Sequence, residues 1–176
     1  MPLIVKDRDG KVLLEVEGPN FLDECDLRRA DFSHQDLEGI YLADSDLTEA
    51  DLTGADLYWV NAFRAKFDRA ILKNAQLNGA NLVEASFKGA DLRGAYISYN
   101  NIGSRANLEG ADLSGALLDG ADLKGCEYSD STRFPDGFDP AAHGMTWVDP
   151  NRFYVRPGSF QAVFIAPGWH VPDKNK

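Results

Sequence analysis

Large apolar side chains return at every fifth position along the middle of this chain. They follow this spacing through Leu22–Ile102 and, after a slip of one residue, through Leu108–Tyr128. The residue two places before each of them is small, most often Ala, and the other three positions are mostly polar or Gly. A period of five fits neither an amphipathic helix nor an alternating strand. The pattern therefore indicates a repeat architecture.

A five-residue unit cannot bury its own apolar side, so it has to stack on copies of itself. We count 22 such units between Asn20 and Asp130 and predict a solenoid. The large central residue and the small residue two before it should point inward. Where the centre shrinks to Ala62, the earlier residue grows to Val60, which roughly conserves core volume. The slip at Gly103–Arg105 predicts a bulge, too short to project as a functional loop.

Tandem units such as Ala50-Asp51-Leu52 and Ala90-Asp91-Leu92 resemble the A(D/N)LXX motif of the pentapeptide-repeat family. The resemblance covers about 110 of the 176 residues. It implies an all-β fold, a right-handed quadrilateral parallel β-helix with one repeat on each side and four in each coil.

The two ends of the chain lack this spacing and are predicted to cap the stack. In residues 1–18, Leu3–Val5 and Val12–Val16 should form a β-hairpin that turns at Asp9-Gly10. Residues 19–130 are expected to form the β-helix that the resemblance implies. Residues 131–176 are rich in Pro and aromatic residues and predict an irregular C-terminal cap, an interface for a partner or a homodimer, or both.

Two local elements are expected within this C-terminal segment. Asp139–Gly144 combines a capping residue, a Pro and a terminal Gly, which favours one or two helical turns. Phe153–Val155 and Phe160–Ile165 should pair as a second hairpin.

Composition mainly excludes functions. The formal net charge of −10 and the pI near 4.7 make direct binding of nucleic acid a poor hypothesis. No apolar run reaches the ~20 residues of a membrane helix, and the start lacks the apolar region of a secretory signal. Three His and two Cys are a poor basis for a closed four-ligand zinc site. We expect no catalytic, cofactor or metal site.

The two cysteines, Cys25 and Cys126, both occupy inward positions five coils apart. That separation is far beyond the reach of a disulfide. Two free, buried thiols favour a cytoplasmic location.

Acidic residues gather in the first coils. Pro19–Phe63 holds 11 acidic residues and two basic ones. With four repeats in a coil, aspartates of successive coils should stack about 5 Å apart. The candidate anionic surface consists of Asp26, Asp31, Asp36, Asp46, Asp51 and Asp56. It either keeps the rod soluble or meets a basic partner.

Large aromatic residues interrupt the polar exterior on one side. Tyr58 and Trp59 leave this side in the second coil, and Tyr96 and Tyr99 leave it two coils later. Exposed Trp and Tyr are favoured anchors of protein interfaces. The alternative is that the aromatic C-terminal segment folds back and covers them.

These observations favour a non-catalytic protein-interaction or scaffold module. The family resemblance implies one alternative, since some members are acidic rods that mimic DNA. Such members bind DNA gyrase or topoisomerase IV and protect against quinolones or gyrase poisons.

Overall fold

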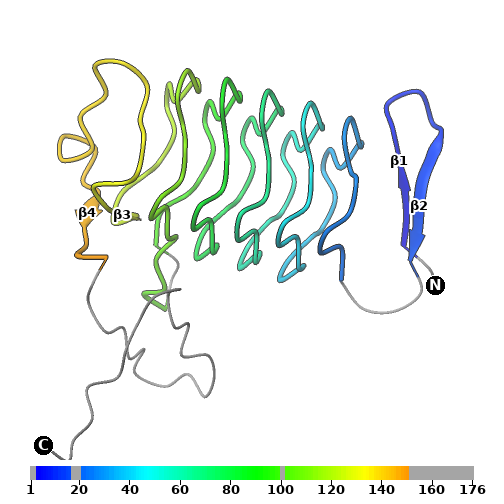
Figure 1. Ribbon diagram of the computed structural model, residues 1–176, viewed down its shortest axis with the longest axis horizontal. Coiled ribbons are helices and arrows are strands. Elements are labelled where there is room, and N and C mark those ends of the chain that lie inside the picture. Colours follow the sequence, from blue (N-terminus) through cyan, green and yellow to red (C-terminus); the bar gives the residue numbers. More distant parts are fainter. Residues whose placement is uncertain (1–2, 17–20, 100–101, 151–176) are drawn as a thin grey trace, which may run out of the picture.

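The computed structural model of the protein describes residues 3–16, 21–99 and 102–150. Figure 1 shows the coils side by side along the long axis, with a hairpin at one end and a short strand pair at the other. In the described part of the chain, regular strands occur only at these two ends. The coils between them are held together by single bridges.

Each bridge joins residues one coil apart, in parallel. Phe21 pairs with Tyr41, Asp26 with Asp46, Asp31 with Asp51, and Asp36 with Asp56. Bridged residues are thus four pentapeptide units apart along the chain, so four repeats make one coil. Each ladder of bridges runs along one side of the rod, which therefore has four sides.

We number the sides by their first bridging residue and, within the pentapeptide units up to Asp130, assign to each side every bridging residue together with the three residues that follow it. Side 1 holds residues 21–24, 41–44, 61–64, 81–84, 107–110 and 127–130. Side 2 holds residues 26–29, 46–49, 66–69, 86–89 and 112–115. Side 3 holds residues 31–34, 51–54, 71–74, 91–94 and 117–120. Side 4 holds residues 36–39, 56–59, 76–79, 96–99 and 122–125. Sides 4 and 1 adjoin at a corner.

The core follows the predicted five-residue register. The central residues and the small residues before them are buried along most of the stack, and Val60 and Ala62 are both fully buried. The rings of Phe67 and Phe87, in adjacent coils, stack with centroids 4.9 Å apart. Cys25, predicted to be buried, is only half-buried, because it lies in the first coil, where no full coil covers it.

The prediction of a one-residue bulge at the register slip is wrong. Bridges before the slip join residues four units apart, as in Gln76 to Tyr96, whereas the next coil runs from Asn81 to Asn107 and is longer. The coil that contains the slip therefore holds six residues more than the coils before it. Ile102, predicted to point inward, is 70% exposed, because a residue of the inserted segment has no coil to pack into. Asn100 stands two places before Ile102, where the repeat pattern also predicts an inward residue, and it lies outside the described residues.

The predicted N-terminal hairpin is present. Strands β1 (Leu3–Lys6) and β2 (Val12–Val16) pair antiparallel. Gly10 has φ +80° at the turn, and its N–H donates to the Asp7 carbonyl at 2.9 Å. Val5 is buried in the core, and the Lys6 carbonyl accepts the N–H of Asp31 at 2.8 Å. The hairpin is thus joined to side 3 of the first coil.

The parallel stack continues beyond the last pentapeptide unit. Strand β3 (Glu127–Tyr128) pairs in parallel with β4 (Thr146–Trp147), which extends the ladder of side 1. The helical turns predicted at Asp139–Gly144 are not formed. The segment makes non-helical hydrogen-bonded turns, and Asp139 caps them by accepting the N–H of Ala141 at 3.0 Å. The hairpin predicted at residues 153–165 lies outside the described residues.

Candidate interaction surfaces

The four sides of the rod differ in charge. Together, sides 1 and 4 carry 11 acidic and two basic residues, a net charge of −9. Sides 2 and 3 carry nine acidic and seven basic residues, a net charge of −2. One half of the rod is therefore strongly acidic and the other is close to balance.

Exposed apolar side chains follow the same division. Sides 1 and 4 expose Phe21, Tyr41, Trp59, Tyr96 and Tyr99, whereas the large hydrophobic residue exposed on sides 2 and 3 is Leu117. The acidic half of the rod is thus also its aromatic half. We call sides 1 and 4 together the acidic-aromatic face.

The four aromatic residues singled out from the sequence all lie on side 4. The rings of Tyr58 and Trp59 stack with centroids 5.9 Å apart, and Trp59 is 47% exposed. Tyr96 bridges between Gln76 and Asp122 in the ladder of this side. The ring of Tyr99 lies over Gly125, where a Cβ atom would approach to 2.9 Å.

Two further aromatic residues escaped the sequence reasoning. Phe21 and Tyr41 bridge on side 1, and their rings stack with centroids 5.0 Å apart. Both are exposed. They occupy the same outward position in units four repeats apart, as the paired aspartates do, and this spacing could have revealed them.

The six predicted acidic residues stack in three pairs, as their spacing indicated. Each of them also accepts a hydrogen bond from the backbone N–H two residues ahead, as Asp51 does from Thr53 at 3.0 Å. Asp31 accepts both the N–H and the hydroxyl of Ser33, and these bonds lower the pKa of that carboxyl. These carboxylates are therefore part of the turn of each repeat as well as surface charges.

The anionic stack is partly neutralised and short. Asp26 is held by the guanidinium of Arg28, with Nε–Oδ1 at 2.7 Å, and this bond lowers the pKa of the carboxyl. Arg8 of the hairpin lies 3.9 Å from Asp51. In the third coil the three ladders continue with Lys66, Ile71 and Gln76. The stacked acids thus extend over two coils.

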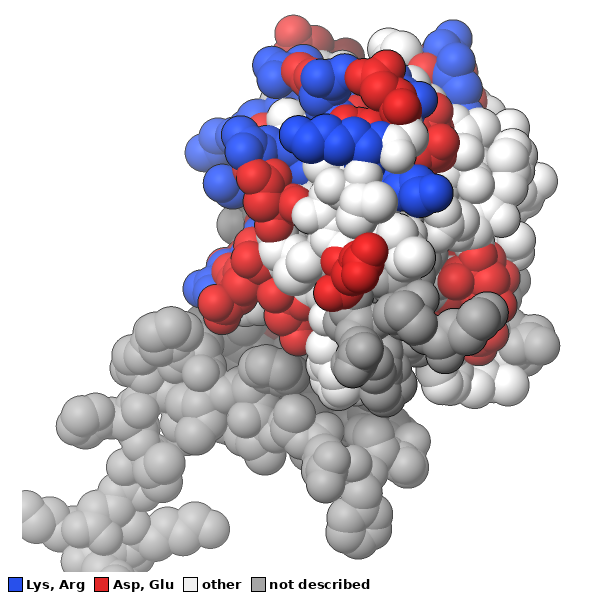
Figure 2. Space-filling model, turned by 90° about the vertical axis from the view of Figure 1, so that its right-hand side faces the viewer, with Lys and Arg blue, Asp and Glu red and all other residues white. Residues whose placement is uncertain are grey.

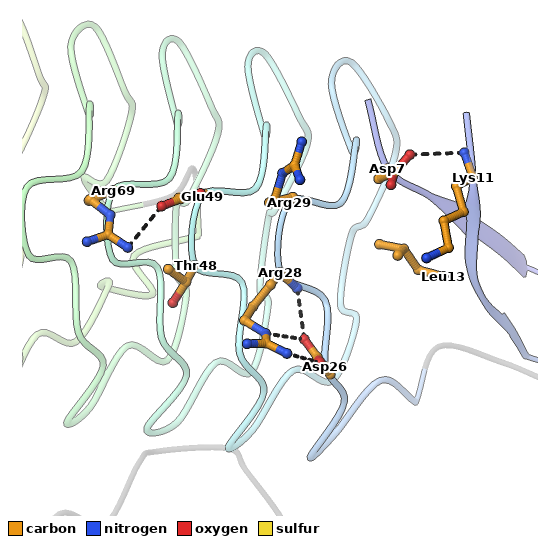
Figure 3. A pocket seen from close by; sticks show the side chains of 9 residues that line it. All are labelled: Asp7, Lys11, Leu13, Asp26, Arg28, Arg29, Thr48, Glu49 and Arg69. Atoms are coloured by element: carbon orange, nitrogen blue, oxygen red, sulfur yellow. Dashed lines mark hydrogen bonds and ion pairs between the residues drawn. The ribbon is translucent and has the colours of Figure 1, made fainter. Parts of the chain in front are cut away.

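An open pocket beside the hairpin is lined mainly by charged residues of both signs (Figure 3). Arg69 pairs with Glu49 at 2.9 Å, and Arg29 lies 3.6 Å from Asp9. Figure 2 looks onto this end of the rod and shows blue and red side chains interspersed there. Because these charges already satisfy one another, the pocket has little net attraction for an ion.

The thiols of Cys25 and Cys126 are free. Cys126 donates its S–H to the Ile97 carbonyl at 2.8 Å, and burial raises the pKa of its thiol. Among the residues described, no group of three His, Cys, Asp or Glu side chains is arranged to hold a metal ion. Nor does that part of the chain contain a helix long and apolar enough to span a membrane.

A family model for pentapeptide repeats matches residues 25–61, 63–98 and 104–127 in eight copies. The gap before residue 104 coincides with the inserted segment. No curated protein matches the chain.

Solved structures of similar proteins share the repeat. HetL of the cyanobacterium Nostoc sp. strain PCC 7120, a pentapeptide repeat protein involved in the regulation of heterocyst differentiation, is 32% identical over 65% of this chain, with a TM-score of 0.61. The chain spans only 50% of HetL. Rfr23 of Cyanothece 51142 is 34% identical over 61% of this chain and 65% of its own, with a TM-score of 0.39. The plasmid-mediated fluoroquinolone resistance protein QnrB1 is 19% identical over 68% of this chain and 78% of its own, with a TM-score of 0.29. A likeness as low as the last carries no argument about function.

Proposed function

Because this chain belongs to the pentapeptide-repeat family, we propose that it is a non-catalytic interaction module that binds a protein partner through its acidic-aromatic face. The observation that carries the proposal is the coincidence of negative charge and exposed aromatic rings on two adjoining sides of the rod. The partner segment that fits such a face is basic and carries apolar side chains.

The two properties of the face have different roles. Exposed Trp and Tyr bury a large area at small entropic cost and are common anchors of interfaces. Trp59 and Tyr99 present such rings from coils two apart. The surrounding carboxylates attract a basic partner over a longer range and speed its association.

A rigid rod suits this role. The coils keep the aromatic side chains at fixed spacings through the parallel bridges, so little order has to be created on binding. HetL, the structural neighbour with the TM-score of 0.61, is itself described as involved in regulation.

The proposal is tested by selecting displayed random peptides on the purified protein. We expect the selected peptides to be basic and to contain aromatic or large aliphatic residues. Replacing Trp59 and Tyr99 by Ser should weaken their binding by roughly tenfold or more. The matched control is Leu117→Ser, which removes an exposed apolar side chain from side 3 and should leave the affinity unchanged. Peptides that lack basic residues, or that respond equally to both variants, would contradict the proposal.

The second candidate is DNA mimicry toward DNA gyrase or topoisomerase IV, and the stacked aspartates are the observation that favours it. A DNA duplex carries its phosphates continuously along the axis, whereas these aspartate pairs occupy two coils. Gyrase-catalysed supercoiling, titrated with the protein with and without a fluoroquinolone, separates the candidates. A binding module for basic segments should have no effect at tens of micromolar. Inhibition, or relief of drug-stabilised cleavage, would favour the mimic.

A further inference from the structure

The chain itself contains a segment with the chemistry that the acidic-aromatic face requires. Residues 151–176 hold four basic residues and one acidic residue. They also hold five aromatic residues, Phe153, Tyr154, Phe160, Phe164 and Trp169. The remainder of the chain, residues 1–150, holds 14 basic and 27 acidic residues. Charge and aromatic content of this last segment are therefore complementary to the rod.

We propose that residues 151–176 bind to the acidic-aromatic face of their own chain and compete there with the partner. This inference rests on the proposed function, because it assigns an occupant to the same face. The segment acts as an internal ligand, so that a partner must displace it.

The chain approaches this face where the described structure ends. Thr146 in β4 pairs with Glu127 and so continues the ladder of side 1. The next residue, Trp147, donates its indole N–H to Asp130 of side 1 at 2.8 Å. The segment that follows Pro150 therefore starts only a few residues from one of the two sides that it is proposed to cover.

Its length is sufficient to reach every part of the face. Seven bridging positions of side 1, from Phe21 to Thr146, are separated by about 4.8 Å each, so the ladder is roughly 30 Å long. The segment from residue 151 to residue 176 extends to at most about 90 Å. A tethered segment that can span the site has an effective concentration in the millimolar range, which favours the chain's own segment over a second copy.

The other half of the rod offers less to a basic segment. On side 2, three carboxylates already have basic partners: Arg28 binds Asp26, Arg69 binds Glu49, and Lys88 lies 3.5 Å from Asp112. Side 4 has four carboxylates and a single basic residue, Lys124. A basic segment therefore gains more by binding where the charges are unbalanced.

Paramagnetic relaxation in the full-length chain tests the inference. A nitroxide is attached to Gln161→Cys in a Cys25→Ser background, because Cys126 is buried. We expect the label to broaden backbone amide signals of Tyr41, Trp59 and Tyr96 while leaving those of Lys66 and Lys88 sharp. Equal broadening on all sides, or none, would overturn the inference. Mixing isotope-labelled chains with spin-labelled chains detects a second copy, and broadening found only in that mixture would also overturn it.

Charge reversal in the segment gives an independent readout. Arg152→Glu with Arg156→Glu should remove the broadening and strengthen binding of the selected peptides by severalfold, because their competitor is lost. Unchanged broadening would contradict the charge complementarity. If the peptides bind through Trp59 but the segment does not broaden this face, the inference fails while the proposed function stands. If neither the peptides nor the segment binds there, both fail.

Discussion

At the scale of single residues, the aspartates that precede each central apolar residue have two roles. Their carboxylates give the rod its negative charge, and they also accept the backbone N–H two residues ahead, as Asp36 does from Glu38 at 3.1 Å. The sequence indicated the stacking of these residues but not the hydrogen bond, because the motif prescribes Asp or Asn without showing where its side chain points. Asn at the same position accepts the equivalent bond in Asn107, from the N–H of Glu109 at 2.8 Å.

Replacing Asp36 and Asp56 by Asn should therefore maintain or raise the melting temperature. Asn retains the acceptor and removes the repulsion between two stacked carboxylates. Replacing both by Ala should lower the free energy of unfolding by about 1 kcal/mol per lost bond. Thermal and urea unfolding of the two double variants measures the difference. A destabilisation by Asn as large as that by Ala would mean that the charge itself, rather than the acceptor, stabilises the turn.

A second residue-scale prediction concerns acid. Arg93 binds Asp91 through Nε and Nη2 at 2.8 and 2.7 Å, and Lys73 lies 3.2 Å away, so the pKa of the Asp91 carboxyl falls from 3.8 to about 2. A depressed pKa in the folded state stabilises the protein above the unfolded pKa, and this contribution is lost as pH falls toward 2. Between pH 5 and pH 2, the free energy of unfolding of the wild type should therefore fall by about 1 kcal/mol more than that of Asp91→Asn, after allowance for solvent screening. Melting curves from pH 5 to pH 2 test this, with Asp119→Asn of the same side as control; parallel curves for Asp91→Asn and wild type would contradict it.

At the scale of the repeat, sequence predicted the register and missed the insertion. The inward positions could be predicted because burial selects large and small apolar residues at a strict period. Ile102 keeps that period yet is exposed, since spacing alone does not distinguish a unit in the stack from one that leaves it. The hairpin could be predicted from its own strands and turn, but its attachment to the first coil depends on backbone contacts such as Lys6 to Asp31.

The last outward residue of each unit, such as Tyr99, lies over the corresponding residue of the next coil, here Gly125. We therefore expect substitutions at two such glycines to differ in their cost to stability. Gly125 and Gly120 both have positive φ, +75° and +69°. A Cβ at Gly125 would lie 2.9 Å from Cδ1 of Tyr99, whereas nothing lies within 4 Å at Gly120. Gly120→Ala should lower the free energy of unfolding by about 1 kcal/mol through backbone strain alone. Gly125→Ala should lower it further, because the Tyr99 ring must also move. Chemical denaturation of both variants provides the comparison, and equal losses would show that the ring adjusts freely.

At the scale of the whole molecule, the candidate site could be predicted only in part. Tyr58, Trp59, Tyr96 and Tyr99 were assigned to one side because the repeat places the two pairs two coils apart. The division of charge between two halves of the rod cannot be read along the chain, where the acidic residues are concentrated in the first coils. It emerges only when residues beyond the longer coil, such as Glu109 and Asp122, are assigned to their sides.

This division predicts that the position of a charge on the rod matters more than the net charge. One triple variant removes three charges from side 4 by the substitutions Asp36→Asn, Glu38→Gln and Asp56→Asn. A second triple variant removes three charges from side 3 by the substitutions Asp31→Asn, Asp51→Asn and Asp119→Asn. The two triple variants have the same net charge, so long-range attraction of a basic peptide is reduced equally in both. Only the first loses carboxylates from the side that carries Trp59 and Tyr96. We expect the selected peptides to bind the side 4 variant severalfold more weakly, with a reduced dependence on salt, and the side 3 variant nearly as wild type. Isothermal calorimetry at two salt concentrations makes the comparison, and equal weakening of both would mean that the rod attracts its partner by net charge without a defined face.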